Sequence, residues 1–549
     1  NYGSSKQTTA TGSGNGGNGY IKELSRITEN ILTYTKNWDE HRFSATGVYS
    51  WQDYVYENLS ISGKGFQNDE TGAWDMGLAD RETMSYASGK YGNTLISFTG
   101  RFTYAYKDRY LMTATARYDG SSRFGTNNKW GFFPSVGLGW RISEETFLAN
   151  NKVITNLKLR GSYGITGNQE IGNYKSLAQL KSKNYIYNDA LMQGFYETIG
   201  NPDLKWERTK QFDLGFDLSL WNRIHLNVDY YSRRTSDLLY DVPIPSTSGF
   251  STMLSNIGIV SNKGVEIALS GRIVETKDFK LDATVNISKN KNEIKELYND
   301  VESITVTSGL GLSKYLKVGE SLLSIYGLKS EGIIKTEEQL AAYQKIVPTA
   351  QLGDEMYADI DDDKAITAKD QINIGETEPN FFYGVALNLE YKKFHLDILG
   401  QGAHDFAAVG ASNSDMKIGI HGYGDSFNYL LVGENQTDNR CCLPSKYAYE
   451  RMWSPSNPNG TFPRAGASNL YLSDRSNSGW NYFIIKSIAL SYDFGNNPIK
   501  GIKGIKGISA FVNLQNFITF ANHRGYNPEN GDTSNPWIKT ITIGVNAKF

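Results

Sequence analysis

Strict alternation of apolar and polar side chains is the feature that most constrains what this chain can fold into. In residues 211–220 the even positions are large and apolar, and the odd positions carry an amide, carboxylates, glycine or serine. The same two-residue period recurs in residues 109–118, 383–392 and 541–549. Successive side chains of a β-strand point to opposite faces, so this pattern predicts strands with one apolar and one polar face.

The apolar faces have the height of a bilayer. Tyr110 and Tyr118 bracket one of them, Tyr383 and Tyr391 bracket another, and each pair is eight residues apart. At about 3.3 Å per residue this is roughly 26 Å, close to the ~25 Å apolar band between the aromatic girdles of membrane barrels. The polar faces carry charges and amides in strand after strand, which suits a wet interior. The sequence therefore favours an all-β fold, a transmembrane antiparallel β-barrel, over a soluble sandwich that buries its apolar faces.

Short and long connections alternate along the chain, as the periplasmic turns and outer loops of bacterial barrels do. The short ones lie at residues 38–40, 107–108, 221–223, 276–278 and 392–393. The long ones lie near residues 67–92, 169–205, 237–257, 297–380 and 403–479. On this parity the long loops are extracellular, and the chain reaches Phe549 at the periplasmic rim.

The strand count suggests part of a larger barrel. We predict about 15 strands, which begin near residues 28, 42, 93, 109, 131, 154, 208, 224, 258, 278, 381, 394, 481, 507 and 538. Before the first of them, the Gly/Asn-rich residues 12–19 are expected to form a surface loop. Single-chain bacterial barrels have even strand numbers, and a complete barrel would start from the periplasm. Residues 1–549 are thus expected to be a C-terminal portion.

Composition argues against several other classes of protein. We find no run of about 18 apolar residues, so helical membrane spans are not expected. The net charge of −2 argues against a nucleic-acid partner. Two cysteines exclude a disulfide framework and a multi-cysteine metal site. The G-x-G-x-x-G of residues 14–19 lacks the strand and helix of a nucleotide site, and no catalytic triad or metalloprotease motif is found, so the prediction is no enzyme.

Several ordered motifs resemble those of the SusC/RagA family, the TonB-dependent outer-membrane transporters of Bacteroidetes. They are YDGSSRFG (118–125), WGFFPSVGLGWRIS (130–143), LRGSYGITGNQEIGNY (159–174), NPDLKWE (201–207), NKGVEI (262–267), GESLLSIYGLKSEGI (319–333) and EPNFFYG (378–384). The resemblance covers nearly the whole chain. It implies a 22-stranded barrel, an N-terminal plug domain and a TonB box, of which the last two are not visible in this sequence.

The resemblance also implies the function. If about 15 of 22 strands are present, seven would precede them and end outside the cell, where the loop parity also places the start of this chain. The family implies import of glycans, or alternatively oligopeptides, across the bacterial outer membrane. It further implies a SusD-like surface lipoprotein as a lid and TonB as the energy source, so the expected partners are these two proteins, outer-membrane lipid and the ligand.

Two rival functions stay open at this point. A passive porin would lack the plug and the lid. A soluble β-rich adhesin or lectin would bury Leu214, Leu387 and Val545 inside a packed sandwich, whereas a barrel exposes them to lipid. The transported substrate is not predicted beyond these classes.

One predicted outer loop carries a calcium-type motif. Ligand positions 1, 3, 5, 7, 9 and 12 of an EF-hand-like loop are filled by Asp359, Asp361, Asp363, the carbonyl of Ala365, Thr367 and Asp370. Lys364 stands where glycine usually makes the sharp turn, and Asp370 replaces the longer bidentate Glu. The alternative is an acidic loop without metal, ordered by Lys364 pairing with a carboxylate.

Three further features of the long loops and of the chain end are candidates for function. Cys441 and Cys442 are adjacent and could close a vicinal disulfide in an oxidising compartment; two reduced thiols are the alternative. Aromatic residues of the long loops are candidates for contact with ligand or lid, or for plain loop packing: Trp74, Tyr423, Trp453 and Tyr471. The end of the chain resembles the signal read by barrel-assembly machinery, or it simply continues the lipid face: Ile541, Ile543, Val545 and Phe549.

Overall fold

The computed structural model describes most of the chain. The residues described are 2–3, 14–66, 74–187, 190–250, 252–298, 301–307, 314–322, 324–376, 378–406, 450–464, 467, 471, 473–474, 480–496, 505–521, 527–529 and 538–549. No helix among them is long and apolar enough to cross a membrane.

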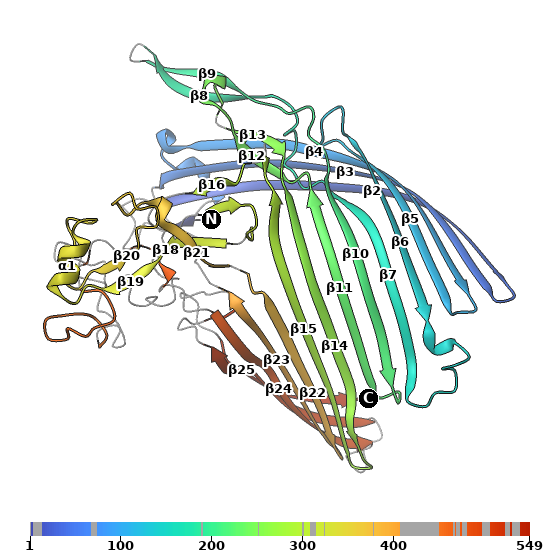
Figure 1. Cartoon of the computed structure of the whole chain (residues 1–549). Coiled ribbons are helices and arrows are strands. Elements are labelled where there is room, and N and C mark those ends of the chain that lie inside the picture. The colour runs from blue at the N-terminus through green and yellow to red at the C-terminus, as the bar shows by residue number, and fades with distance from the viewer. Residues whose placement is uncertain are drawn as a thin grey trace. The chain divides into compact units, whose positions relative to one another are not determined.

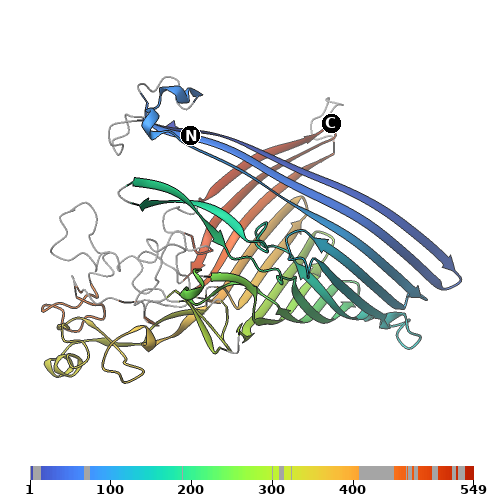
Figure 2. The same cartoon turned by 90° about the horizontal axis from the view of Figure 1, so that it is seen from above.

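One antiparallel sheet dominates the described residues, and its strands lie side by side in sequence order (Figure 1, Figure 2). Within these residues it has sixteen strands, of which β1 is only two residues long. They are β1 (Tyr2–Gly3), β2 (Gly14–Trp38), β3 (His41–Phe66), β4 (Ser85–Tyr106), β5 (Tyr110–Ser121), β6 (Trp130–Arg141), β7 (Ile154–Asn168), β10 (Glu207–Leu220), β11 (Ile224–Ser236), β14 (Ile259–Glu275), β15 (Phe279–Glu296), β22 (Phe381–Tyr391), β23 (Phe394–Phe406), β24 (Trp480–Asn496), β25 (Gly507–Ala521) and β26 (Thr540–Lys548). The fifteen long strands confirm the predicted number and order.

The predicted short turns close the hairpins at one end of the strands. Lys107 and Asp108 both have positive φ, at 55° and 54°, and the Arg109 N–H donates to the Tyr106 carbonyl. Trp221 and Asn222 repeat this geometry, with φ of 52° and 53°. Two consecutive positive φ values match the twist of the flanking strands, so these turns set the register of each hairpin.

The prediction of a surface loop is wrong for residues 14–19. They are not a surface loop, because β2 already begins at Gly14 and pairs with the far end of β3, with Gly16 opposite Gly63 and Gly19 opposite Ser60. Glycine carries no side chain to reveal a strand, but a long partner such as β3 supplies the backbone hydrogen bonds that hold it. In the same way β4 begins at Ser85, before the predicted start near residue 93.

The long connections contain small elements of their own. The hairpins and short strands are β8 (Gln179–Tyr187), β9 (Ala190–Thr198), β12 (Leu239–Pro243), β13 (Thr252–Asn256), β16 (Ser303–Thr307), β17 (Lys314–Lys317), β18 (Ser324–Leu328), β19 (Ser330–Ile333), β20 (Glu355–Tyr357) and β21 (Gln371–Glu376). The helices are α1 (Glu337–Tyr343) and the 3₁₀ turns Met76–Leu78, Arg81–Thr83, Ser246–Ser248 and Ala368–Asp370; a further 3₁₀ turn, Ile142–Glu144, lies in the connection between β6 and β7.

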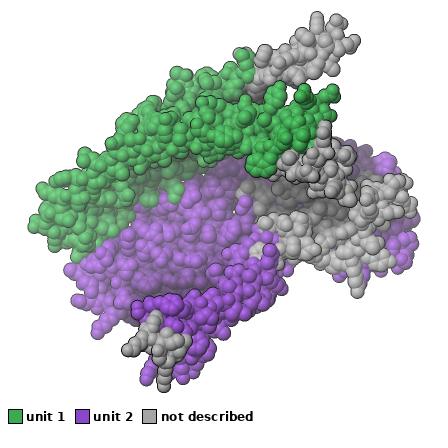
Figure 3. Space-filling view, turned by 180° about the vertical axis from the view of Figure 1, so that it is seen from behind, with its two compact units in different colours: residues 1–139, 162–211, 235–257 green, residues 140–161, 212–234, 258–549 purple. Residues whose placement is uncertain are grey.

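The chain divides into two compact units (Figure 3). The first unit comprises residues 1–139, 162–211 and 235–257, and the second comprises residues 140–161, 212–234 and 258–549. Strands β6, β7, β10 and β11 contribute residues to both. Each unit has its own packed cluster at the loop side of its strands.

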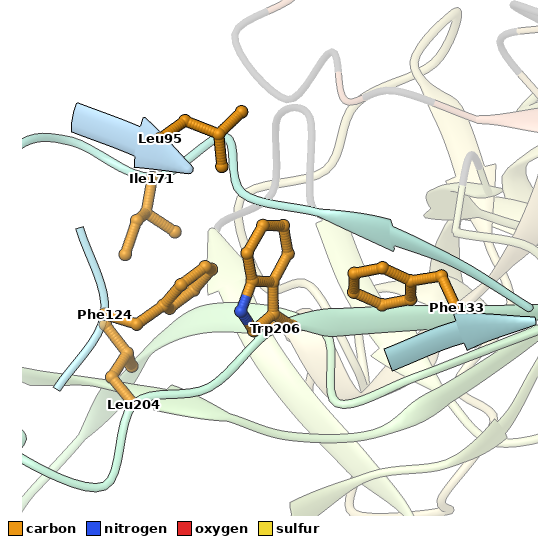
Figure 4. Close-up of a cluster of buried hydrophobic side chains, with 6 residues drawn as sticks. All are labelled: Leu95, Phe124, Phe133, Ile171, Leu204 and Trp206. Atoms are coloured by element: carbon orange, nitrogen blue, oxygen red, sulfur yellow. The ribbon is translucent and has the colours of Figure 1, made fainter. Parts of the chain in front are cut away.

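In the first unit, residues of four separate sequence motifs meet in a dry cluster around Trp206 (Figure 4). Phe124 and Phe133 lie on either side of the indole, with ring centroids 4.8 and 5.2 Å from it, and the indole N–H donates to the Lys129 carbonyl at 3.0 Å. Leu204 is completely buried beside them. Gly125 has to be glycine here, because a Cβ atom would lie 1.8 Å from the Pro202 carbonyl oxygen. We call this set the Trp206 cluster; its other members are Leu95 and Ile171.

In the second unit, residues 324–376 pack with residues 450–464, 467, 471 and 473–474 into a small loop body. Its apolar centre is formed by Ile334, Tyr343 and Ala350. The two segments are joined by the ion pair of Arg464 with the buried Asp354 carboxylate, at 2.7 Å, and by the Ser330 N–H donating to Asp474 at 2.9 Å. Burial raises the pKa of the Tyr343 phenol to about 12, so this group stays neutral at physiological pH.

Candidate functional site

The apolar faces of the long strands are exposed to the surroundings, and no second layer of described residues packs against them. Leu214 is 46% exposed and Val545 is 68% exposed, while Leu387 is half-buried among its strand neighbours. A soluble sandwich would seal such residues inside a core. Exposed apolar bands of this kind are stable only in contact with lipid.

Aromatic rings gather at both ends of these bands, as the tyrosine spacing predicts. In the first unit, Tyr106 stacks with Tyr110 near the short turns, at 6.4 Å between ring centroids, and Tyr118 stacks with Trp130 at the other end, at 4.8 Å.

The second unit repeats the arrangement. Phe394 lies against Tyr492 near the short turns, with centroids 4.7 Å apart, and Tyr383 stacks with Phe483 at the loop end, at 5.7 Å. Both units thus carry the two aromatic belts that sit at membrane–water interfaces.

The opposite, polar face is held together by charged groups on neighbouring strands. Arg160 of β7 donates to both oxygens of Asp229 on β11, at 2.6 and 2.8 Å, and to Asp217 of β10, at 3.0 Å. One guanidinium therefore serves two carboxylates, which leaves a net negative charge at this place. This group was not predictable from the sequence, because its three members lie up to 69 residues apart.

A ladder of amide groups runs from the polar face to the loops of the second unit. The Tyr231 hydroxyl donates to Asn290 at 3.0 Å, and the side-chain amides of Asn290 and Asn292 both donate to the Asn262 oxygen, at 3.3 and 2.9 Å. The Asn292 oxygen in turn accepts the Leu322 N–H at 2.9 Å. We call these residues the asparagine ladder.

Two of the family-like motifs meet in this ladder. Asn262 begins NKGVEI, and Leu322 lies in GESLLSIYGLKSEGI. The glycine of the first motif has a steric role, because a Cβ atom on Gly264 would lie 2.4 Å from the Tyr231 ring. Next to the ladder, the Glu320 carboxylate accepts hydrogen bonds from the Tyr326 hydroxyl on β18 and from the Asn373 amide on β21.

A hollow of about 500 Å³ opens on the polar face of the second unit. It is lined from β11, β14, β15, β22, β23 and β24 by polar side chains, by the aromatic rings of Phe382, Tyr383 and Tyr482, and by Ile267 and Ile287. Sequence reasoning missed it, although one signal was present: Phe382 is an aromatic residue on the polar phase of its strand, two residues before Gly384.

The predicted calcium loop is partly assembled. Carboxylate oxygens of Asp359, Asp361 and Asp363 all lie within 4.8 Å of one another. Lys364 takes the positive φ, 63°, that glycine usually supplies at this position. Three of the acidic ligand positions and the sharp turn therefore suit a divalent cation.

Two contacts differ from the calcium pattern. Asp370 is fully buried and turned into the loop, where its two oxygens accept the N–H groups of Ile360 and Thr367, both at 2.7 Å. The ammonium of Lys369, and not that of Lys364, lies 3.6 Å from Asp361 and 3.9 Å from Asp363. Calcium binding through these residues, with the Ala365 carbonyl and Thr367, stays a prediction.

The aromatic loop candidates separate into two kinds. Trp74 is 90% exposed and free to meet a partner. Trp453 packs over Gly353, where a Cβ atom would lie 2.2 Å from the indole, and the Tyr471 N–H donates to the Tyr357 hydroxyl at 3.0 Å. Their contact with ligand or lid stays a prediction.

The remaining predicted site residues lie at the end of the chain and in the predicted long loop of residues 403–479. Ile541, Ile543, Val545 and Phe549 are all exposed on or just after β26, and the assembly role predicted for them is untested. Tyr423, Cys441 and Cys442 lie outside the described residues.

Comparison with known proteins agrees with this architecture. The family model described as "TonB dependent receptor-like, beta-barrel" matches residues 1–315. TonB-dependent receptor P3 of Formosa agariphila is 31% identical over 99% of this chain, and TonB-dependent receptor SusC of Bacteroides thetaiotaomicron is 28% identical over 100% of it. The chain spans about half the length of these relatives, 54% and 53%.

A solved structure resembles the fold closely. The RagAB peptide importer in the "closed-closed" state superimposes with a TM-score of 0.81 at 26% identity, covering 98% of this chain and 57% of the other. The matches to SusC and RagAB confirm the SusC/RagA resemblance. The chain belongs to the TonB-dependent receptor-like β-barrel family and is an outer-membrane protein.

Proposed function

We propose that this chain forms barrel wall and outer loops of an active importer that carries glycans across the outer membrane. The observation that supports this most directly is the pair of unlike faces on the long strands: an exposed apolar band between aromatic belts, and a polar face with charged groups along its length. Such a wall gives a hydrophilic molecule a path through lipid. It does no bond chemistry.

The proposal includes two protein partners. A SusD-like lipoprotein would cover the long loops as a lid, and TonB would supply energy through the plug domain that the family resemblance implies. The RagAB peptide importer makes oligopeptides the alternative cargo. A passive porin is the alternative mechanism.

Growth experiments test the proposal in the source bacterium. The gene would be deleted and the strain grown on a panel of neutral and acidic glycans as carbon source, and on oligopeptides as nitrogen source. We expect growth to fail on one glycan class only, to return on complementation with the whole gene, and to require TonB. If the deletion strain fails to grow only on oligopeptides, the cargo is an oligopeptide and not a glycan. Uptake that persists without TonB would favour a passive porin.

The lid protein has its own measurement. Purification of the tagged whole transporter from outer membranes should bring down a surface lipoprotein encoded next to it. A transporter that purifies alone under mild detergent, with full uptake in a strain lacking the neighbouring gene, would contradict that part of the proposal.

A further inference from the structure

The hollow on the polar face of the second unit is built by two neighbouring rows of side chains. Strand register places Glu266 opposite Ser288, and Ser288 opposite Phe382, across β14, β15 and β22. Cross-strand partners on one face are about 5 Å apart, so a carboxylate, a hydroxyl and an aromatic ring stand side by side. Their outer ends line the cavity.

The second row makes room for a ligand. Ala268, Asn286, Gly384 and Gln401 are paired in sequence across the same strands and β23. Two of the four have little or no side chain, so the floor of the hollow is low beside Phe382. Asn286 places an amide group at its edge, where it can bind polar substituents of a molecule lying over the ring, whereas the Gln401 amide already donates to Glu529.

The ring and the carboxylate of the first row are available. Phe382 is 45% exposed and stacks on no aromatic ring of the described residues. Glu266 is exposed and has no hydrogen bond or ion pair with any residue that the structure describes. By contrast, Asp229 at the other wall is already held by Arg160, and Glu529 nearby is paired with Lys486 at 2.7 Å.

The charges and hydrogen-bonding groups select a class of ligand. Asp217 and Asp229 share one guanidinium, and Glu266 adds a second net negative charge, so anionic chains are repelled. A cationic ligand would need only hydrogen-bond acceptors from the lining of the hollow. The hollow also offers donors, from Ser288 and Asn286, beside an apolar ring. Carbohydrate rings combine an apolar C–H face with hydroxyls that both donate and accept, which matches this mixture of an apolar surface and a few placed polar groups.

We propose that the hollow is a binding subsite for a neutral saccharide, stacked on Phe382 with hydroxyls bound by Ser288, Asn286 and Glu266. The proposal deepens the import function and rests on it. It narrows the cargo to uncharged glycans and assigns to the wall of the barrel a contact with the moving ligand.

A protection experiment on the whole transporter with its natural partners tests the site. Ser288→Cys would be introduced with Cys441→Ser and Cys442→Ser, and labelling of the introduced thiol by a small maleimide would be followed in outer-membrane vesicles. The probes are maltoheptaose, cellohexaose, xylohexaose and mannohexaose, with oligoalginate and a lysine-rich heptapeptide for comparison. We expect at least one neutral oligosaccharide to slow labelling about fivefold or more, and the two charged probes to have no effect.

Three outcomes of this experiment would overturn the subsite. The heptapeptide could protect the introduced thiol while no sugar does, which would assign the hollow to a cationic peptide. Alternatively, the introduced thiol could react readily with the maleimide while none of the probes slows its labelling. Finally, the reagent could fail to reach the thiol at all, which would mean that another part of the transporter fills the hollow.

Affinity measurements on variants separate this inference from the import function. For the protecting oligosaccharide, Phe382→Ala should weaken binding about tenfold, as expected for loss of a central aromatic contact, and Glu266→Gln by less. Glu390→Gln is the matched control, because Glu390 lies on the same face at the other end of β22 and pairs with Lys280. If uptake occurs and both site variants bind like the wild type, the subsite is wrong and the import function stands; if the wild type takes up no glycan, the import function fails first. Heat-dependent migration on a denaturing gel confirms that each variant is folded.

Discussion

The two units attach their loops to the strands by opposite means. In the first unit the Trp206 cluster is dry: six apolar side chains from distant parts of the chain pack together with a single hydrogen bond from the indole. In the second unit the asparagine ladder is polar, and each step from Tyr231 to Leu322 is a hydrogen bond between named atoms.

The difference teaches what each attachment provides. Apolar burial is strong and non-directional, so the Trp206 cluster contributes stability in proportion to the area that it removes from water. A net hydrogen bond contributes about 1 kcal/mol, but it fixes geometry, and a member left without its partner is costly. We therefore expect the first unit to lose most stability on mutation and the second to lose mainly the position of its loop body.

The largest expected effect is at the dry attachment. Trp206→Ala removes the ring that lies between Phe124 and Phe133 and should lower the free energy of unfolding by about 3–5 kcal/mol. Denaturant unfolding of the protein in detergent measures this. Trp74→Ala is the matched control, since that indole is 90% exposed. Equal effects of the two changes would mean that the cluster is not a stabilising core.

The next largest expected effect concerns the apolar and polar faces of the long strands, to which both sets of loops are attached. Leu387→Lys places a charge at the middle of the apolar band between Tyr383 and Tyr391 and should cost about 2–4 kcal/mol on folding into lipid vesicles. Asn388→Lys, one residue further on the polar face, should cost little. The reverse order would mean that the two faces of β22 are assigned the wrong way round.

Mutation of the asparagine ladder should lower the free energy of unfolding less than mutation of the Trp206 cluster, but it should displace the loop body. Asn262→Ala leaves the amides of Asn290 and Asn292 without their shared acceptor, at a cost of about 1–3 kcal/mol. We expect faster proteolysis within residues 324–376, with the strands still protected. Asn388→Ala serves as the control on the same face. Unchanged cleavage of the loop body in Asn262→Ala would show that the ladder does not position it.

The strands and turns were predictable because their signals are local. The period of two residues in 211–220 and the turn residues at 107–108 and 221–223 act within one hairpin, and the tyrosine pairs mark the membrane height. The glycine-rich start of β2 escaped because glycine has no side chain to show a period, and its strand state comes from pairing with β3.

The contacts at the loops were not predictable from one sequence. Phe124 meets Leu204 and Trp206 about eighty residues later, and Arg160 meets Asp217 and Asp229 only because register brings three strands together. The motifs indicated that these residues matter to the family. They did not indicate whether a given motif packs into an apolar cluster, as Phe124 and residues 203–206 do, or forms hydrogen bonds, as Asn262 does.

The smallest expected effect concerns an ion at the loop body. If calcium binds at Asp359, Asp361 and Asp363, a tenfold excess over its Kd stabilises the loop by about 1.4 kcal/mol, measured as slower proteolysis near residue 364. Asp361→Asn should remove the response. Lys369→Gln should strengthen it, because its ammonium lies 3.6 Å from Asp361 and competes with the cation. A calcium response that is absent from both the wild type and Lys369→Gln would mean that the loop body, like the ladder beneath it, is ordered by side chains alone.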